Sequence, residues 1–216
     1  MNDDSIDEIL SLKRRAEALR NNDKFERALD VLDEVINRLE NLKLTAAGDE
    51  QMLNKINSGL ADTHGMKGGV YRRLKNYHAA LNEYRNGVEL ETKDTLSTYN
   101  LGNEIVLSIM LRESSLDDEF MRYRLSTAID RLEKQMASER SDEWWAWADL
   151  GQFHLLNGQV EAAREAYAKG RETGPSSAEY QRSLDVLEDI AVAIKQDWPD
   201  QSVQIESFVR EMRATF

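Results

Sequence analysis

The most informative segment of the chain is WADLGQFHLLNGQVEAAREAYAKGRETGP, residues 147–175. It contains two stretches with helical spacing of small and apolar residues, separated by a polar turn. Gly151 and Ala163 are small, so two antiparallel helices can approach each other closely at these positions. Trp147 and Tyr167 are large and fill the space that remains. The segment therefore predicts a closely packed helical hairpin.

Two residues mark where the predicted helices end. Gly158 suits the turn that ends the first helix, and Pro175 follows the second helix, where a helix cannot continue. The whole pattern resembles the tetratricopeptide repeat, a helix–turn–helix unit of about 34 residues. It departs from that repeat at His154, where an aromatic residue is usual, and at Gly170, where alanine is usual.

The same signature recurs upstream at a constant interval. Pairs of small residues occur at Ala16 and Ala28, at Gly68 and Ala80, and at Gly151 and Ala163. The interval between the two members is the same in all three pairs. Because three copies at one spacing seldom arise by chance, we expect three hairpins of the same kind.

A further hairpin between these units is irregular. Gly102 restarts the pattern, but the matching small residue, Ala128, lies much further along the chain than in the other units. We assign the extra length to a polar loop at residues 112–119, with Ser114 or Ser115 as the N-cap of the following helix. A second excess, at residues 44–48, predicts a loop before a long helix.

The sequence predicts an all-α protein, a tetratricopeptide-like right-handed array of about five antiparallel hairpins with a C-terminal capping helix pair. Two prolines in the chain and no alternation of β-branched residues support helices throughout. A cap is expected because an end repeat would otherwise leave its apolar face in water. We expect a single domain over residues 1–216, with repeats at about 8–42, 49–91, 95–137 and 141–175 and the cap at 176–216. The helices are expected at about 3–21, 24–42, 49–73, 77–90, 95–112, 117–137, 141–156, 160–172, 176–196 and 200–214.

Composition excludes several classes of function. The 28 Lys and Arg against 40 Asp and Glu give a formal charge of −12, so duplex nucleic acid and anionic membranes are poor partners. The chain has no cysteine, which excludes disulfides, a thiol nucleophile and thiolate metal sites. It has no apolar run long enough to cross a membrane, and its first residues are acidic where a secretory signal would be basic. We therefore expect a cytoplasmic protein.

Nothing in the sequence forms a recognisable catalytic or metal site. The three histidines, His64, His78 and His154, do not lie at metal-ligand spacing on one helix, and the common hydrolase and nucleotide-binding motifs are missing. His64 and Asp62 would be the nearest acid–base pair, but residues two apart on a helix do not face each other. We predict a protein that is not an enzyme, with no cofactor and no metal.

The repeat register, carried over from the tetratricopeptide family, assigns residues to a concave groove lined by the first helix of each hairpin. These positions include Lys13, Glu17 and Arg20 in the first unit, Asp62 in the second, Val106 in the third, and Ala148 and Gln152 in the fourth. From this register and the neighbouring polar groups we predict a ligand site consisting of Gly65, Gly69, Arg72, Arg73, Tyr99, Asn100, Asn103 and Trp145.

These residue types suit an acidic ligand. Arginine offers a planar fork to a phosphate or carboxylate, Tyr99 can stack on a ring, and asparagine can bind an amide or a base edge. Gly65 and Gly69 each cost about 1 kcal/mol relative to alanine inside a helix. Either another helix or a ligand approaches them closely. The alternatives for the polar residues are ion pairs with neighbouring helices for the arginines, a bridge between helices for Asn103, and packing on the inserted helix for one of Trp144 and Trp145.

Three strings resemble a more particular family. They are DTHGMKGGVYRR at 62–73, YRNGVELE at 84–91 and TYNLGN at 98–103. They are similar to the tetratricopeptide-type sensor domain of bacterial conflict and stress-signalling proteins, a relative of the TRAF-binding region of ASK-type kinases. The resemblance implies a regulatory module that senses a small ligand, nucleotide-derived for example, or holds signalling partners. Since no effector is attached within 216 residues, the effector would act in trans.

Two functional hypotheses follow from the sequence. In the first, the chain is a non-enzymatic sensor or adaptor in bacterial stress or defence signalling that binds an acidic ligand in its groove. In the second, it is a plain scaffold that holds a peptide or helix of a protein partner. The two differ in the depth of the groove, since a small-molecule site needs an enclosed pocket.

Overall fold

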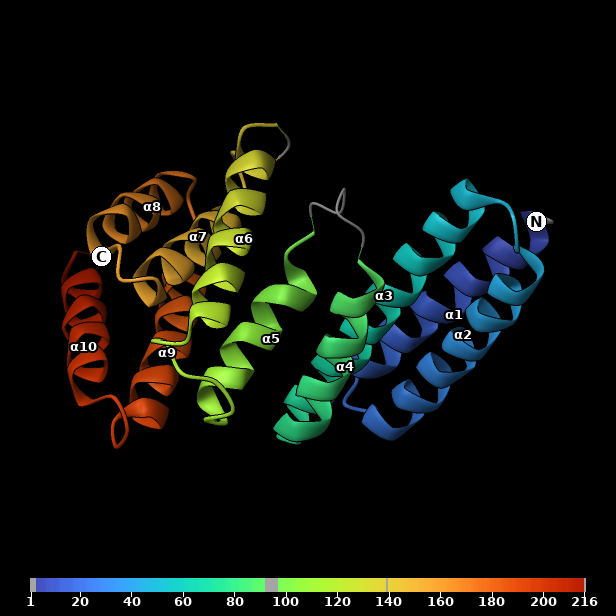
Figure 1. Cartoon of the computed structure of the whole chain (residues 1–216), viewed down its shortest axis with the longest axis horizontal. Helices are drawn as coiled ribbons and strands as arrows, with labels where there is room; N and C mark the ends of the chain where they lie inside the picture. The colour runs from blue at the N-terminus through green and yellow to red at the C-terminus, as the bar shows by residue number, and fades with distance from the viewer. Residues whose placement is uncertain (1–2, 92–96, 139, 216) are drawn as a thin grey trace. The chain divides into compact units, whose positions relative to one another are not determined.

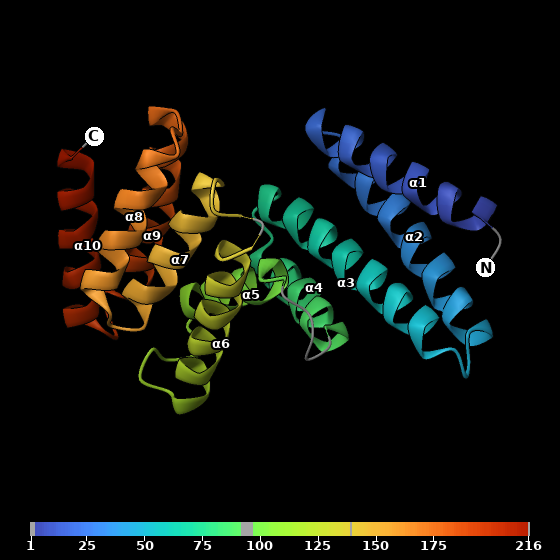
Figure 2. The same ribbon diagram turned by 90° about the horizontal axis from the view of Figure 1, so that it is seen from above.

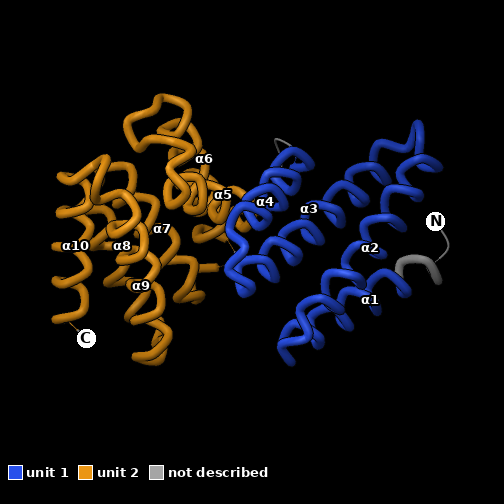
Figure 3. The backbone as a smooth tube through the Cα atoms, turned by 90° about the horizontal axis from the view of Figure 1, so that it is seen from below, with its two compact units in different colours: residues 1–95 blue, residues 96–216 orange. Residues whose placement is uncertain are grey.

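The computed structural model describes residues 3–91, 97–138 and 140–215, and all the regular secondary structure in these ranges is helical (Figure 1). The described residues form ten helices, which Figure 2 shows from above: α1 (Asp3–Asn21), α2 (Phe25–Thr45), α3 (Glu50–Arg73), α4 (Tyr77–Leu90), α5 (Tyr99–Met110), α6 (Glu119–Met136), α7 (Trp144–Leu156), α8 (Val160–Glu172), α9 (Ser177–Ile194) and α10 (Pro199–Ala214). The predicted all-α, repeat-like fold is confirmed. Residues 1–95 and 96–216 form two compact units, coloured separately in Figure 3.

In the first unit, α1 and α2 form one hairpin and α3 and α4 form the next. Helices α1, α2 and α3 share two apolar clusters. The first contains Ile9, Val35, Leu39, Ile56 and Leu60, and the second contains Ala16, Ala28, Val31, Leu32 and Val70. These residues recur at helical spacing, so burying them together is the main source of stability for this unit.

The small residues that recur at a constant interval lie buried where the two helices of a hairpin touch, as predicted. Ala16, Ala28, Ala80 and Ala163 are at most 1% exposed, and Gly68 and Gly151 are also buried. A Cβ atom on Gly68 would lie 2.7 Å from Cε1 of Tyr84, and one on Gly151 would lie 2.5 Å from Cδ2 of Tyr167. The glycines are therefore required because the tyrosine of the partner helix lies directly against the backbone.

The second unit is built around α5, α7 and α9. Nine of the twelve residues of α5 and nine of the thirteen of α7 are buried. Five apolar residues of α9 are fully buried: Leu184, Leu187, Ile190, Ala191 and Ile194. Helix α9 packs against α5 and α7 as well as against α10, so this helix is part of the core of the unit.

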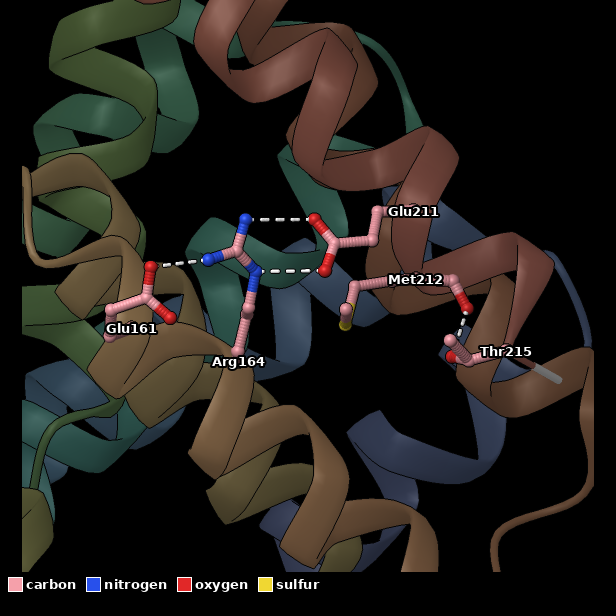
Figure 4. Close-up of polar contacts among 5 residues, drawn as sticks. All are labelled: Glu161, Arg164, Glu211, Met212 and Thr215. Atoms are coloured by element: carbon pink, nitrogen blue, oxygen red, sulfur yellow. Dashed lines mark hydrogen bonds and ion pairs between the residues drawn. The ribbon is translucent and has the colours of Figure 1, made fainter.

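Aromatic and ionic contacts hold helix α10 against helix α8. The ring of Tyr167 in α8 lies 5.9 Å from that of Tyr180 in α9 and 5.5 Å from that of Phe208 in α10, both edge-on. Figure 4 shows the guanidinium of Arg164 in α8, whose Nε and Nη2 donate to the two carboxylate oxygens of Glu211 in α10 at 2.8 and 2.9 Å. The paired bonds fix the orientation of α10.

The irregular hairpin α5–α6 differs from the prediction at the start of its second helix. Helix α6 begins after Asp118, whose carboxylate accepts a hydrogen bond from the backbone nitrogen of Phe120, so neither Ser114 nor Ser115 is the N-cap. The hydroxyl of Ser115 instead accepts from the backbone nitrogen of Asp117 within the loop, at 3.1 Å. Gly102 faces Phe153 of α7, to which a Cβ would approach within 2.7 Å.

Candidate functional site

Four of the predicted site residues lie in the last turns of α3. Gly65 is buried, Gly69 and Arg72 are partly buried, and Arg73 is exposed. Nη1 of Arg73 donates to the backbone carbonyl of Arg20, at 3.3 Å, in the last turn of α1. Because this carbonyl belongs to a helix C-terminus, the contact ties the end of α1 to the end of α3.

Other cations predicted near this group also have protein partners. The ammonium of Lys13 in α1 forms an ion pair with the carboxylate of Asp62 in α3. Arg20 contacts Glu17 at 3.4 Å, one turn away on the same helix. The positive charge on this part of α1 is therefore partly balanced by carboxylates.

The remaining predicted residues lie on α5 and α7, in the second unit. Tyr99 is 51% exposed, and its backbone carbonyl accepts from Nδ2 of Asn103 at 2.7 Å. Asn100 is 3% exposed and so lies inside the unit. Trp145 is 37% exposed, its Nε1 donates to Glu143 at 2.8 Å, and the guanidinium of Arg140 lies 4.9 Å from the ring centre.

Burial separates these residues into surface and interior positions. Tyr99 and Trp145 offer aromatic surface, whereas Asn100 and the register positions Val106, Ala148 and Gln152 are buried. The predicted residues divide between the two units, with the α3 group in residues 1–95 and the others in residues 96–216. Their joint role in binding a ligand stays a prediction.

Sequence reasoning missed an ion network that joins three helices of the first unit. Nζ of Lys67 in α3 lies 2.7 Å from Oδ1 of Asp33 in α2 and 2.8 Å from Oε1 of Glu83 in α4. Nδ1 of His64 lies 2.7 Å from Oε2 of the same glutamate. His64 therefore pairs with Glu83, and Asp62 pairs with Lys13, so the acid–base pair considered from sequence is not formed.

The network shifts two pKa values in the directions expected for a stabilising ion pair. Burial raises the pKa of Glu83, but hydrogen bonds from His64 and Lys67 outweigh it, so the pKa of this carboxyl lies below its usual value. Burial lowers the pKa of Lys67, yet bonds to Asp33 and Glu83 leave it above its usual value. The signal available in the sequence was the spacing of His64 and Lys67, one turn apart on the same face of α3.

A second buried charge pair lies between α5 and α6. The carboxylate of Glu104 is 4% exposed and forms an ion pair with Arg124, and it accepts a hydrogen bond from the hydroxyl of Ser108 at 3.1 Å. The guanidinium of Arg124 also lies 5.4 Å from the ring centre of Phe120. These contacts hold the irregular hairpin together.

Across residues 3–91, 97–138 and 140–215, no group of three or more His, Asp or Glu side chains is arranged to hold a metal ion. None of the described helices combines the length and the apolar character needed to cross a bilayer.

Comparisons with known families identify the repeats. Two models described as tetratricopeptide repeat match the chain, one at residues 61–94 and one at residues 120–185. The first match covers the second half of α3 and all of α4, and the second runs from α6 into α9. The chain therefore contains tetratricopeptide repeats in both units. No curated protein matched the sequence significantly.

Two solved structures with a TM-score just above 0.5 have the same fold. The TPR-like repeats of a putative kinesin light chain from Podosopora anserina, and a point variant of them, each match with a TM-score of 0.51 at 15% identity, over 100% of this chain and 98% of theirs. The structure of MamA matches with a TM-score of 0.42 at 18% identity, over 93% of this chain and 95% of that one. The matches do not support the more specific resemblance to a TRAF-binding or ASK-type sensor domain.

Proposed function

We propose, on the basis of its tetratricopeptide repeats, that this protein is a non-enzymatic scaffold that binds a protein partner. The observation that carries the proposal is the match of both units to repeats of this kind. Stacked helical hairpins present extended surfaces rather than a single reaction centre, and such surfaces suit peptides and helices.

Exposed aromatic residues support a role in protein binding. Aromatic side chains contribute large contact areas to interfaces. Tyr99 on α5 is 51% exposed and lies on the first helix of its hairpin, the side expected to receive a partner. Tyr77 on α4 and Tyr123 on α6, which are 36% and 68% exposed, lie on second helices and provide matched positions for comparison.

Site-specific photo-crosslinking in the native cell tests the scaffold proposal. A benzophenone amino acid replaces Tyr99, Tyr77 or Tyr123 in turn, and adducts are identified by mass spectrometry. We expect one recurrent protein adduct from position 99 and not from the other two, followed by measurable binding of that purified protein. The same adducts from all three positions, without binding by the purified protein, would contradict the proposal.

The acidic-ligand hypothesis remains the second candidate, since Arg72 and Arg73 stand side by side at the end of α3. The contact of Arg73 with Arg20 gives this arginine a structural role as well. Thermal unfolding against a panel of nucleotides and dinucleotides tests it. A bound ligand raises the midpoint. The rise should vanish in Arg72→Ala/Arg73→Ala and persist in Arg14→Ala/Arg15→Ala, a pair of exposed adjacent arginines on α1.

A further inference from the structure

The loop between α5 and α6 forms one wall of a hollow of about 380 Å³ in the second unit. We call this cavity the loop hollow. Its other walls are the first turn of α6, the α7–α8 turn and the first turns of α10. The volume lies within the range of about 300–1,000 Å³ that is common for ligand pockets.

Several contacts hold the loop wall in place. Arg112, at the start of the loop, donates from Nε to the backbone carbonyl of Ala193 at 3.1 Å and from Nη1 to Gln196 at 3.4 Å. It also lies 3.2 Å from Asp197. These three residues are at the end of α9 and just beyond it, so the loop is fixed to the core of the unit, and its end is fixed by the Asp118 cap of α6. A wall held in this way is formed before any ligand arrives.

The floor of the loop hollow is aliphatic. It consists of four residues that are at most 6% exposed: Leu116, Leu155, Leu156 and Ile205. Gly158, at the edge of the floor, has a φ of +77°, and a Cβ added there would meet no atom within 4 Å. These residues leave only small apolar areas open, which suit the tip of an apolar side chain such as leucine.

The rim is rich in amides and balanced in charge. Asn157, Gln201 and Gln204 each carry both a donor and an acceptor, as a peptide group does. The two charged residues of the lining, Asp117 and Arg122, form an ion pair at 3.3 Å. The lining is therefore neutral in a protein of charge −12, and it favours neither an anion nor a cation.

We propose that the loop hollow binds an extended, uncharged peptide segment of a partner protein, with one leucine-like side chain on the aliphatic floor and its backbone amides on the rim. The choice of a peptide as the ligand rests on the scaffold function proposed above. It adds a second binding site that is formed by the insertion.

The test uses purified full-length protein and three capped tripeptides, acetyl-Ala-Xaa-Ala-amide with leucine, aspartate or lysine in the middle. Two-dimensional nitrogen–proton NMR observes the side-chain NH₂ groups of Asn157, Gln201 and Gln204 directly. We expect the leucine peptide to shift these signals and the Gly158 backbone signal in a saturable way. The charged peptides should bind at least about tenfold more weakly, since the floor cannot solvate a charge.

Two variants locate the site. Gln201→Ala/Gln204→Ala should lower the affinity for the leucine peptide about tenfold, because two hydrogen bonds that each contribute modestly to binding are lost. Gln201 is partly buried and Gln204 exposed on a helix, and alanine is a good helix former, so the variant should fold. Gln51→Ala, an exposed glutamine on α3, is the matched control and should bind as the wild type does.

Three outcomes would overturn the proposal: no saturable shift at the three amides with the leucine peptide, equal affinity for the charged peptides, or unchanged affinity in the double variant. Because the probes are synthetic peptides, failure here leaves the crosslinking test at Tyr99 unaffected. If crosslinking at Tyr99 gives no specific partner and the leucine peptide binds, the loop hollow would be the site of partner binding.

Discussion

Alanine substitution at two glycines of α3 provides a sharp test of how the repeat packs. Gly59 and Gly68 lie in the same helix, nine residues apart. A Cβ at Gly59 would lie 3.5 Å from the side chain of Leu39, an ordinary contact. A Cβ at Gly68 would lie 2.7 and 2.8 Å from two ring atoms of Tyr84, whose side chain is fully buried.

The two substitutions should have opposite effects on the free energy of unfolding. Replacing glycine by alanine inside a helix stabilises by about 1 kcal/mol. Gly59→Ala should therefore gain about 1 kcal/mol. Forcing an extra methyl into a filled core costs about 1–3 kcal/mol, and the fully buried ring of Tyr84 places Gly68→Ala at the upper end. Subtracting the helix gain leaves a net loss of about 2 kcal/mol.

Urea unfolding followed by far-ultraviolet circular dichroism measures both variants. All four tryptophans lie in the second unit, at Trp144, Trp145, Trp147 and Trp198, so tryptophan fluorescence reports on that unit alone. The circular dichroism signal includes the helices of both units. Comparing the two signals assigns the change to the first unit.

A Gly68→Ala protein as stable as the wild type would refute the packing argument, because Tyr84 would then be able to move away at no cost. A Gly59→Ala protein that loses stability would refute the argument that a methyl group fits beside Leu39 without strain. If both variants shift the tryptophan transition as much as the helical signal, the two units unfold together.

Three further predictions concern charge and turns. The pKa of Glu83 is depressed in the folded protein, so the contribution of this carboxylate to stability is present at neutral pH and is lost as the pH falls below about 4.5. The urea midpoints of the wild type and of Glu83→Gln should therefore differ at pH 7 and converge in acid. Arg164→Gln removes the paired bonds to Glu211 and should speed amide hydrogen exchange in α10 while leaving α1–α4 unchanged. Gly174, with a φ of +84°, should lose about 1–2 kcal/mol of stability on change to alanine and less on change to asparagine, as measured by thermal unfolding.

The locations of the helices were available from the sequence because local signals determine them. The ends of α3, α4, α7 and α8 lie within three residues of the expected bounds. Gly158 adopts the left-handed conformation expected after α7, and Asn76 caps α4 by accepting from the backbone nitrogen of Ala79 at 3.3 Å. Signals of this kind act over a few residues and need no tertiary contact.

Side-chain partners across helices were predicted poorly. Neither the contact of Arg73 with a backbone carbonyl of α1 nor the burial of Asn100 was anticipated from the sequence. The register of a helix tells which residues share a face, but not which atoms of a neighbouring helix that face meets. The rotation and crossing of each helix pair decide this.

The sequence by itself determined an all-α fold of repeated hairpins, because small and large residues recur at the interval where two helices touch. Only the tertiary structure decided that Lys67 joins Asp33 and Glu83, that Gly102 meets Phe153, and that the α5–α6 insertion forms a hollow with α7 and α10. Each of these contacts joins residues that are distant in the chain. Their positions depend on the packing angles of several helices at once, which no local pattern encodes.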